Sequence, residues 1–357
     1  YGGHETTALD LADPGASILH RNGIAPVPPP LPPLQHQRSY LQLPRNSPRN
    51  RNFNIFDERI EATANHLLMD FTVRRYSQLL QSLREQGFLF LRVEDYLKTC
   101  SLQREHRTNY SHNDTHDPEL GTANPSRQKL VILRHDVDAK PQNSLKLGYI
   151  EHSLGIHGTY YFRLPHTFHP PIIKEISAMG HEVGYHYETM AQTKKGREQG
   201  QEQEDHFDRA YELFVENLEK LRTIVPVTTI CMHGSPLSRF DNREIWKKYD
   251  YRELGIIGDA YIDIDFTQVA YFTDTGRRWN GAEVSIRDKV SDPYKFHLKT
   301  TEDLIGAIPQ FPEKVMITIH PQRWNDAPLP WTGELLLQNT KNIIKRILVK
   351  TGVSNRT

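Results

Sequence analysis

The sequence has few cysteines, no long apolar run and no net charge. Its 357 residues include two cysteines, Cys100 and Cys231, which are too few for a disulfide scaffold and match no zinc-ligand spacing. No run of about 18 apolar residues occurs, which excludes a membrane span. The 44 Lys and Arg residues balance the 44 Asp and Glu residues, so no overall basic field indicates binding to nucleic acid or to an anionic membrane.

Apolar residues are also scarce, at 37% of the chain, so we expect part of it to lie outside a packed core. Residues 1–57 hold nine of the 23 prolines and are interpreted as a disordered tail, because proline favours extended chain over helix or sheet. The P-x-x-P matches in the tail leave open a partner that reads proline motifs. We predict one folded domain over residues 58–350, with a polar surface insertion at 103–128.

From Lys129 onward, short apolar runs alternate with helical patterns. This alternation is typical of parallel βαβ units, and about seven units favour a distorted (β/α)7-type barrel of parallel strands over an open sheet. The predicted strands are 130–133, 159–162, 183–185, 228–232, 256–264, 268–273 and 315–319, and a further short apolar run lies at 88–91. The predicted helices are 58–68, 73–86, 142–154, 171–179, 207–224, 242–249, 301–308 and 334–349.

Four predicted strands are followed by carboxylate or imidazole side chains. Reactive groups of parallel barrels lie just beyond the carboxyl ends of the strands, so we expect these side chains to meet at one edge. The four segments are Arg134-His135-Asp136-Val137-Asp138, His186-Tyr187-Glu188, His233-Gly234-Ser235-Pro236 and His320-Pro321-Gln322-Arg323-Trp324.

The first two segments indicate a metal site. Asp136 and Asp138 are two residues apart and share one face of a strand, as do His186 and Glu188. Two neighbouring carboxylates repel each other, and a divalent cation removes that conflict. One His with carboxylates suits Zn²⁺ or another first-row metal. The alternative for Asp138 is a helix N-cap.

The last two segments leave more than one role open. His320 follows a buried-type strand and suits a general acid, because the reference pKa of His is about 6.5. Arg323 and Trp324 come next, and a Trp face is a common platform for a sugar ring. His233 fits a metal ligand, a substrate contact or a structural histidine.

At these residues the sequence resembles the NodB-like polysaccharide deacetylases, carbohydrate esterase family four, over about 71–349. Leu133–Asp138 is similar to the family's first motif, and Gly180–His186 to its second. Met232–Pro236 stands where the groove-lining third motif is expected, and Ile317–His320 is similar to the last motif.

The resemblance implies a role for each matching residue. Asp136 corresponds to the catalytic base, Asp138 and His186 to metal ligands, and His320 to the general acid. The family's second metal-binding His falls at Met190, whose thioether is a poor Zn²⁺ ligand. Glu188 is therefore predicted as third ligand, with His233 or a weakly held metal as alternatives.

The predicted function is metal-dependent removal of an N- or O-acetyl group from a carbohydrate. Arg134 or Arg163 is expected to orient Asp136, and His233, Arg163, Arg323 and Trp324 are predicted to contact substrate. Two alternatives stay open: an inactive glycan-binding barrel, and a hydrolase of a non-sugar C–N bond. The sequence leaves a cytoplasmic and a secreted location equally open.

Overall fold

A computed structural model describes residues 69–110, 128–193, 204–235, 238, 240–279, 290, 293–294 and 296–350, all within the compact unit Arg59–Thr357. Side chains are described for these residues except 103–110, 204–205 and 344–350. The predicted tail 1–57 and the predicted helix 58–68 lie outside this part. Among the described helices, none is both long and apolar enough to cross a bilayer.

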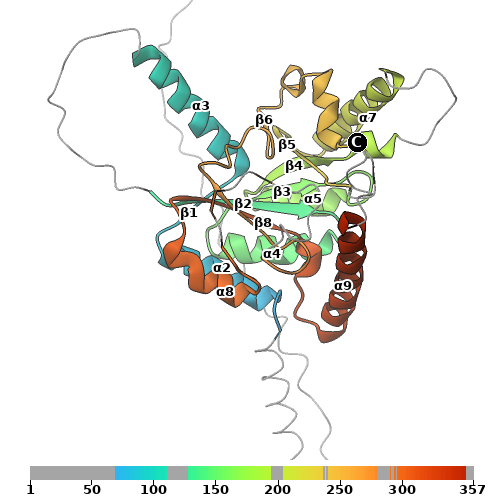
Figure 1. Cartoon of the computed structure of the whole chain (residues 1–357). Coiled ribbons are helices and arrows are strands. Elements are labelled where there is room, and N and C mark those ends of the chain that lie inside the picture. Colours follow the sequence, from blue (N-terminus) through green and yellow to red (C-terminus); the bar gives the residue numbers. More distant parts are fainter. Residues whose placement is uncertain are drawn as a thin grey trace, which may run out of the picture. The chain divides into compact units, whose positions relative to one another are not determined.

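The described strands form one parallel sheet that curls into a half-barrel, with helices between the strands (Figure 1). Seven strands follow the order β6-β5-β4-β3-β2-β8-β7, and β1 also pairs with β2, which confirms the distorted (β/α)7-type architecture. The strands are β1 (Leu89–Leu91), β2 (Leu130–Val137), β3 (Thr159–Phe162), β4 (Glu182–Tyr187), β5 (Thr229–Met232), β6 (Gly258–Asp259), β7 (Ala270–Thr273) and β8 (Lys314–Ile319).

Helices cover the sheet. They are α2 (Val73–Glu85), α3 (Val93–Tyr110), α4 (Gln142–Ser153), α5 (Pro170–Ala178), α6 (Thr189–Gln192), α7 (Glu204–Arg222), α8 (Thr301–Ala307) and α9 (Pro328–Lys350). The described residues also form the 3₁₀ helices η1 (Asn242–Lys247), η2 (Tyr251–Leu254), η4 (Ile308–Gln310) and η5 (Pro321–Arg323).

The central strand β2 contributes to two hydrophobic clusters because its side chains alternate between the faces of the sheet. Val131 and Leu133 belong to a cluster that includes residues of α2 and α8. Ile132 belongs to a second cluster with α5 and α7. β2 is therefore packed against side chains on both faces, and this packing fixes the position of its carboxyl end.

Four predicted segments differ from the structure. α3 continues to Tyr110, into the stretch predicted as a surface insertion. The predicted strand 256–264 is reduced to Gly258–Asp259, because Asp259 accepts hydrogen bonds from the backbone N–H groups of Tyr261 and Ile262 and turns the chain. The predicted helix 242–249 is the 3₁₀ helix η1, and α9 begins at Pro328, six residues earlier than expected.

A buried carboxyl group links the amino ends of the strands to α3. Glu182, at the start of β4, accepts hydrogen bonds from the backbone N–H of Glu94 at 3.0 Å and from the Thr159 hydroxyl at 2.7 Å. The Thr229 hydroxyl also donates to it. Burial raises the pKa of Glu182 from 4.5 to about 7, even though these donors act in the opposite direction.

We predict that Glu182→Gln removes a pH dependence of stability. Because the folded pKa lies above the unfolded one, Glu182 favours folding fully below about pH 4.5, and this contribution disappears as the pH rises through about 7. The shift corresponds to about 3 kcal/mol in the free energy of unfolding. Chemical denaturation at pH 5 and pH 8 measures this change in the free energy of unfolding. The stability of Glu182→Gln relative to the natural protein should be higher at pH 8 than at pH 5. An equal difference at both pH values would contradict the prediction.

Candidate active site

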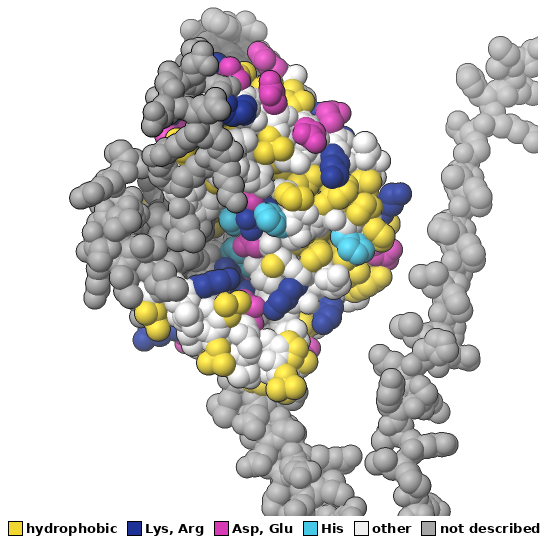
Figure 2. Space-filling view, turned by 90° about the vertical axis from the view of Figure 1, so that its right-hand side faces the viewer, with side chains coloured by type: hydrophobic (Ala, Val, Ile, Leu, Met, Phe, Trp, Pro, Cys, Tyr) yellow, Lys and Arg dark blue, Asp and Glu magenta, His cyan; other side chains and the backbone are white. Residues whose placement is uncertain are grey.

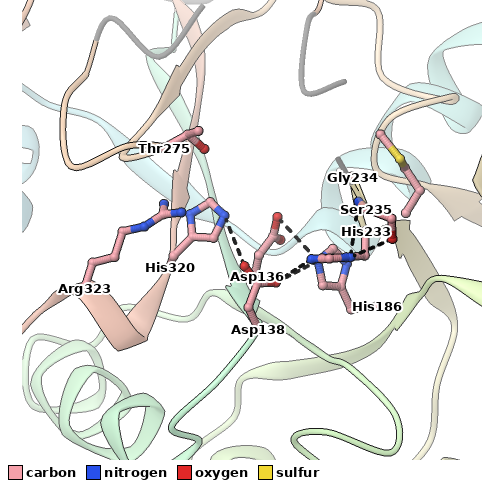
Figure 3. A pocket seen from close by; sticks show the side chains of 10 residues that line it. Asp136, Asp138, His186, His233, Gly234, Ser235, Thr275, His320 and Arg323 are labelled. Atoms are coloured by element: carbon pink, nitrogen blue, oxygen red, sulfur yellow. Dashed lines mark hydrogen bonds and ion pairs between the residues drawn. The ribbon is translucent and has the colours of Figure 1, made fainter. Parts of the chain in front are cut away.

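The four strand-end segments meet at the carboxyl edge of the sheet and line one polar pocket (Figure 3). Register explains the meeting, since β2 pairs with both β3 and β8, and His186 of β4 is opposite Cys231 of β5. β2 is four residues longer than predicted, so Asp136 lies within the strand. The pocket is lined by Asp136, Asp138, His186, Met232, His233, Gly234, Ser235, Thr275, His320 and Arg323.

Asp138, His186 and His233 form a group of convergent ligand atoms. Asp138 Oδ1 lies 3.3 Å from His186 Nε2 and 3.6 Å from His233 Nε2, and one ligand atom of each residue lies within 4.8 Å of the others. His186 Nδ1 lies 3.0 Å from the Cys231 carbonyl, which can only accept, so Nδ1 carries the proton. In neutral His186, the lone pair of Nε2 therefore faces the carboxylates.

These residues fit a divalent cation. Asp138 Oδ1 is buried and has no hydrogen-bond partner, which is costly for a carboxylate oxygen unless a cation satisfies it. One carboxylate and two imidazoles are ligands that Zn²⁺ takes readily. A second group of ligand atoms, from Asp136, His186 and Cys231, also lies within 4.8 Å.

Arg134 orients Asp136. Its guanidinium donates two hydrogen bonds to the carboxylate, from Nε to Oδ1 at 2.8 Å and from Nη2 to Oδ2 at 2.6 Å. Burial acts to raise the pKa of Asp136, but the charge and the hydrogen bonds of Arg134 act against burial, and this pKa lies below its usual value. Asp136 thus faces the pocket as a carboxylate that can accept a proton.

Asp274, which the sequence analysis missed, holds His320. His320 Nδ1 lies 2.6 Å from Asp274 Oδ1, and the His320 backbone N–H donates to Oδ2 at 2.9 Å. Burial raises the pKa of Asp274, but the charges of Arg323 and His320 outweigh burial and lower it to about 2. His320 Nε2 is left facing the pocket, 3.8 Å from Asp138 Oδ2. The available signal was that Asp274 directly follows the predicted strand 268–273.

One predicted substrate contact and one predicted orienting role are corrected. Trp324 is fully buried, and its indole N–H donates to Asp274 at 2.8 Å, so its face is not available to a sugar ring. Arg163 does not orient Asp136, because its Nε donates to Glu188 at 2.5 Å. Arg323 does line the pocket, and its Nη1 donates to Asp274 at 2.5 Å.

Glu188, predicted as the third metal ligand, lies behind His233 and outside the convergent group. Its Oε2 is 3.0 Å from His233 Nδ1, and its Oε1 accepts from Arg163 and from Gln192. Burial acts to raise the pKa of Glu188, but the hydrogen bond with His233 and the charge of Arg163 lower it to about 2. Met190, at the position of the family's second His, is buried in the core on α6.

No protein-family model matches the chain, and neither does any curated protein. Solved structures do match. One is a mutant of a CE4 family pseudoenzyme with restored enzymatic activity, at 14% identity and a TM-score of 0.35. The match covers 61% of this chain and 63% of the pseudoenzyme chain, so this chain spans less than two thirds of the length of that protein.

Two more solved structures belong to the same group of matches. A family 4 carbohydrate esterase from Bacillus anthracis has 9% identity and a TM-score of 0.31, and the match covers 74% of this chain and 84% of that one. The catalytic domain of a peptidoglycan N-acetylglucosamine deacetylase from Eubacterium rectale has 13% identity and a TM-score of 0.32, covering 64% and 89%. These TM-scores are below 0.5, so the function below rests on the residues of the site.

Proposed function

We propose that the chain is a metal-dependent deacetylase that removes an N- or O-acetyl group from a carbohydrate. One observation carries this proposal: a convergent group of cation ligands has a carboxylate close to one of its members and an imidazole close to another. Asp136 Oδ2 is 3.9 Å from His186 Nε2, and His320 Nε2 is 3.8 Å from Asp138 Oδ2. A base and an acid beside one cation are what acyl transfer to water requires.

Asp138, His186 and His233 would hold the cation, and Zn²⁺ is the ion that best suits this donor set. When bound, it supplies a Lewis acid that acidifies a water molecule and polarises a carbonyl oxygen. His233 thus takes the role predicted for Glu188. Glu188 instead orients His233 by accepting at its Nδ1, as carboxylates commonly do for metal-binding histidines.

The other side chains move protons. Asp136, oriented by Arg134, accepts a proton from the attacking water. His320 donates a proton from Nε2 to the leaving nitrogen or oxygen, while Asp274 accepts from Nδ1 and keeps the ring in place. Each proton transfer contributes a factor of roughly 10² to 10⁴ in rate.

The carbohydrate substrate is proposed from the motif resemblance, at Asp136, Asp138, His186 and His320. Arg323, which lines the pocket, is the proposed substrate-facing polar group beside the cation, since His233 is assigned to the cation itself. Since Trp324 is buried, stacking on this ring has no part in the proposal.

Two measurements on the purified chain test the proposed function. Titration with Zn²⁺ or Co²⁺ should show one ion bound per chain at neutral pH. Acetate should be released from N-acetylglucosamine polymers in the presence of the ion. Absence of stoichiometric binding would favour a glycan-binding barrel without catalysis, and turnover of ureides in place of acetylated sugars would favour a non-sugar C–N hydrolase.

We predict that Glu188→Gln weakens cation affinity by roughly 10- to 100-fold, the usual effect of losing the partner of a metal-binding histidine. The charge that fixes His233 is removed while the size of the side chain is kept. His233→Ala should lose more affinity, because it removes a ligand. A Co²⁺ titration followed by absorbance measures both. Unchanged affinity in Glu188→Gln would mean that His233 does not need this carboxylate.

A further inference from the structure

Helix α9 has its polar face inward and an apolar face outward. Glu334, Gln338 and Asn342 follow one another at four-residue spacing and are 7%, 4% and 7% exposed. On other parts of the helix, Leu329, Leu336, Leu337 and Ile343 are 86%, 63%, 50% and 57% exposed. An ordinary surface helix has the reverse arrangement, with its apolar stripe against the core.

The polar side chains on the inward face of α9 make specific hydrogen bonds with the domain. These hydrogen bonds set the orientation of the helix. Glu334 accepts from Lys140 at 3.1 Å, and Asn342 donates to the Gly276 carbonyl at 3.0 Å. Gln338 donates to Asn342 at 2.9 Å, and the Trp331 indole N–H donates to the Asp70 carbonyl at 2.6 Å. The apolar side chains are therefore held away from the domain.

The exposed apolar residues form one stripe, which we name the α9 stripe: Leu329, Leu336, Leu337 and Ile343. Leu329, Leu336 and Ile343 are seven residues apart, which is two helical turns, and Leu337 is beside Leu336. Nine large hydrophobic side chains are exposed in the described part of the chain, and four of the nine belong to this stripe. Such a concentration on one helix marks an interaction surface.

We compare two partners for the α9 stripe, a second copy of the chain and a lipid surface. The area of the stripe and the charge of the helix distinguish between them. The α9 stripe runs from Leu329 to Ile343, roughly 22 by 10 Å or about 220 Å², whereas a stable protein interface buries about 800 Å² on each partner. The helix sequence also has four basic residues, Lys341, Lys345, Arg346 and Lys350, against one acidic residue, Glu334. Two such helices side by side would repel each other.

We propose that the α9 stripe inserts into the surface of an anionic membrane, with α9 lying in the plane of the interface. Apolar residues on one face with Lys and Arg nearby are typical of interfacial helices. Each basic residue near an anionic surface strengthens binding by roughly fivefold. Figure 2 views the side of the molecule on which α9 lies in Figure 1, and shows hydrophobic side chains with basic and acidic ones among them on this face.

Binding of the whole chain to vesicles tests the proposal independently of any hydrolytic activity. The natural chain should sediment with phosphatidylcholine vesicles that contain phosphatidylserine, and far less with vesicles of phosphatidylcholine alone. The double variant Leu336→Glu/Ile343→Glu should lose at least tenfold in affinity, and Lys341→Glu should lose several-fold. The control Leu102→Glu/Ile262→Glu makes the same change at two residues that are 58% and 45% exposed elsewhere, and should bind like the natural chain.

Three outcomes would overturn the proposal. They are no sedimentation of the natural chain with anionic vesicles, equal binding to both vesicle types, and equal loss in the control variant. Analytical ultracentrifugation is the second measurement: a dimer that Leu336→Glu/Ile343→Glu abolishes would assign the stripe to a second copy instead. Circular dichroism of each variant confirms that the fold is kept, and Leu336→Gln/Ile343→Gln serves if the glutamates disturb it.

Discussion

Asp138→Asn is expected to lose cation binding and hydrolysis together, whereas His320→Ala keeps the cation and loses turnover. Asp138 is the carboxylate between His186 and His233, so its neutral amide removes the charge that attracts the cation to both imidazoles. We expect cation affinity to fall by at least roughly 100-fold, more than for loss of a group that only orients a ligand. His320 lies outside this ligand group, and its loss should cost roughly 10² to 10⁴ in kcat.

Calorimetric titration with Zn²⁺ and acetate release at saturating Zn²⁺ separate the two variants. The control is Asp265→Asn, which changes an exposed carboxylate whose hydrogen bonds are to Thr267 and Gln268. It should match the natural chain in both measurements. Full activity in His320→Ala would remove the general acid from the proposed mechanism, and tight Zn²⁺ binding by Asp138→Asn would remove Asp138 from the ligand set.

The sequence was informative about the architecture because burial imposes a pattern on it. Val131, Ile132 and Leu133 are consecutive apolar residues, as expected of a strand covered on both faces, and they are buried in the centre of the sheet. The residue at which β2 ends was less predictable. Arg134 and Asp136 are polar, and the ion pair between them satisfies both charges where β2 continues to Val137 in the interior.

The site was predictable where one strand carries two groups, and less so where the groups come from different strands. The relation of Asp136 to Asp138 follows from spacing alone. The choice of His233 over Glu188 depends on how β4 and β5 pair, and that register places His233 beside His186. Trp324 next to His320 suggested a sugar platform, but its environment is set by Phe71 and Tyr76, whose rings pack against it.

Asp274→Asn is expected to impair both turnover and stability, because the carboxylate of Asp274 serves three partners. It accepts from His320, Arg323 and Trp324 and is fully buried. Without its charge, His320 loses the group that fixes its ring and its tautomer, and we expect kcat to fall by roughly 10² to 10⁴. Arg323 is left as a buried cation without its anion, which should cost about 3–5 kcal/mol.

Cation affinity separates this positioning role from general damage to the site. Asp274 is absent from the ligand group, so Asp274→Asn should bind Zn²⁺ like the natural chain once folded. Asp259→Asn is the matched control, since Asp259 is also a fully buried carboxylate but accepts from Tyr187 and Tyr261. Urea denaturation, Zn²⁺ titration and acetate release on the two variants decide the matter. If both lose activity equally, Asp274 supports the fold alone; if only Asp274→Asn does, it acts through His320.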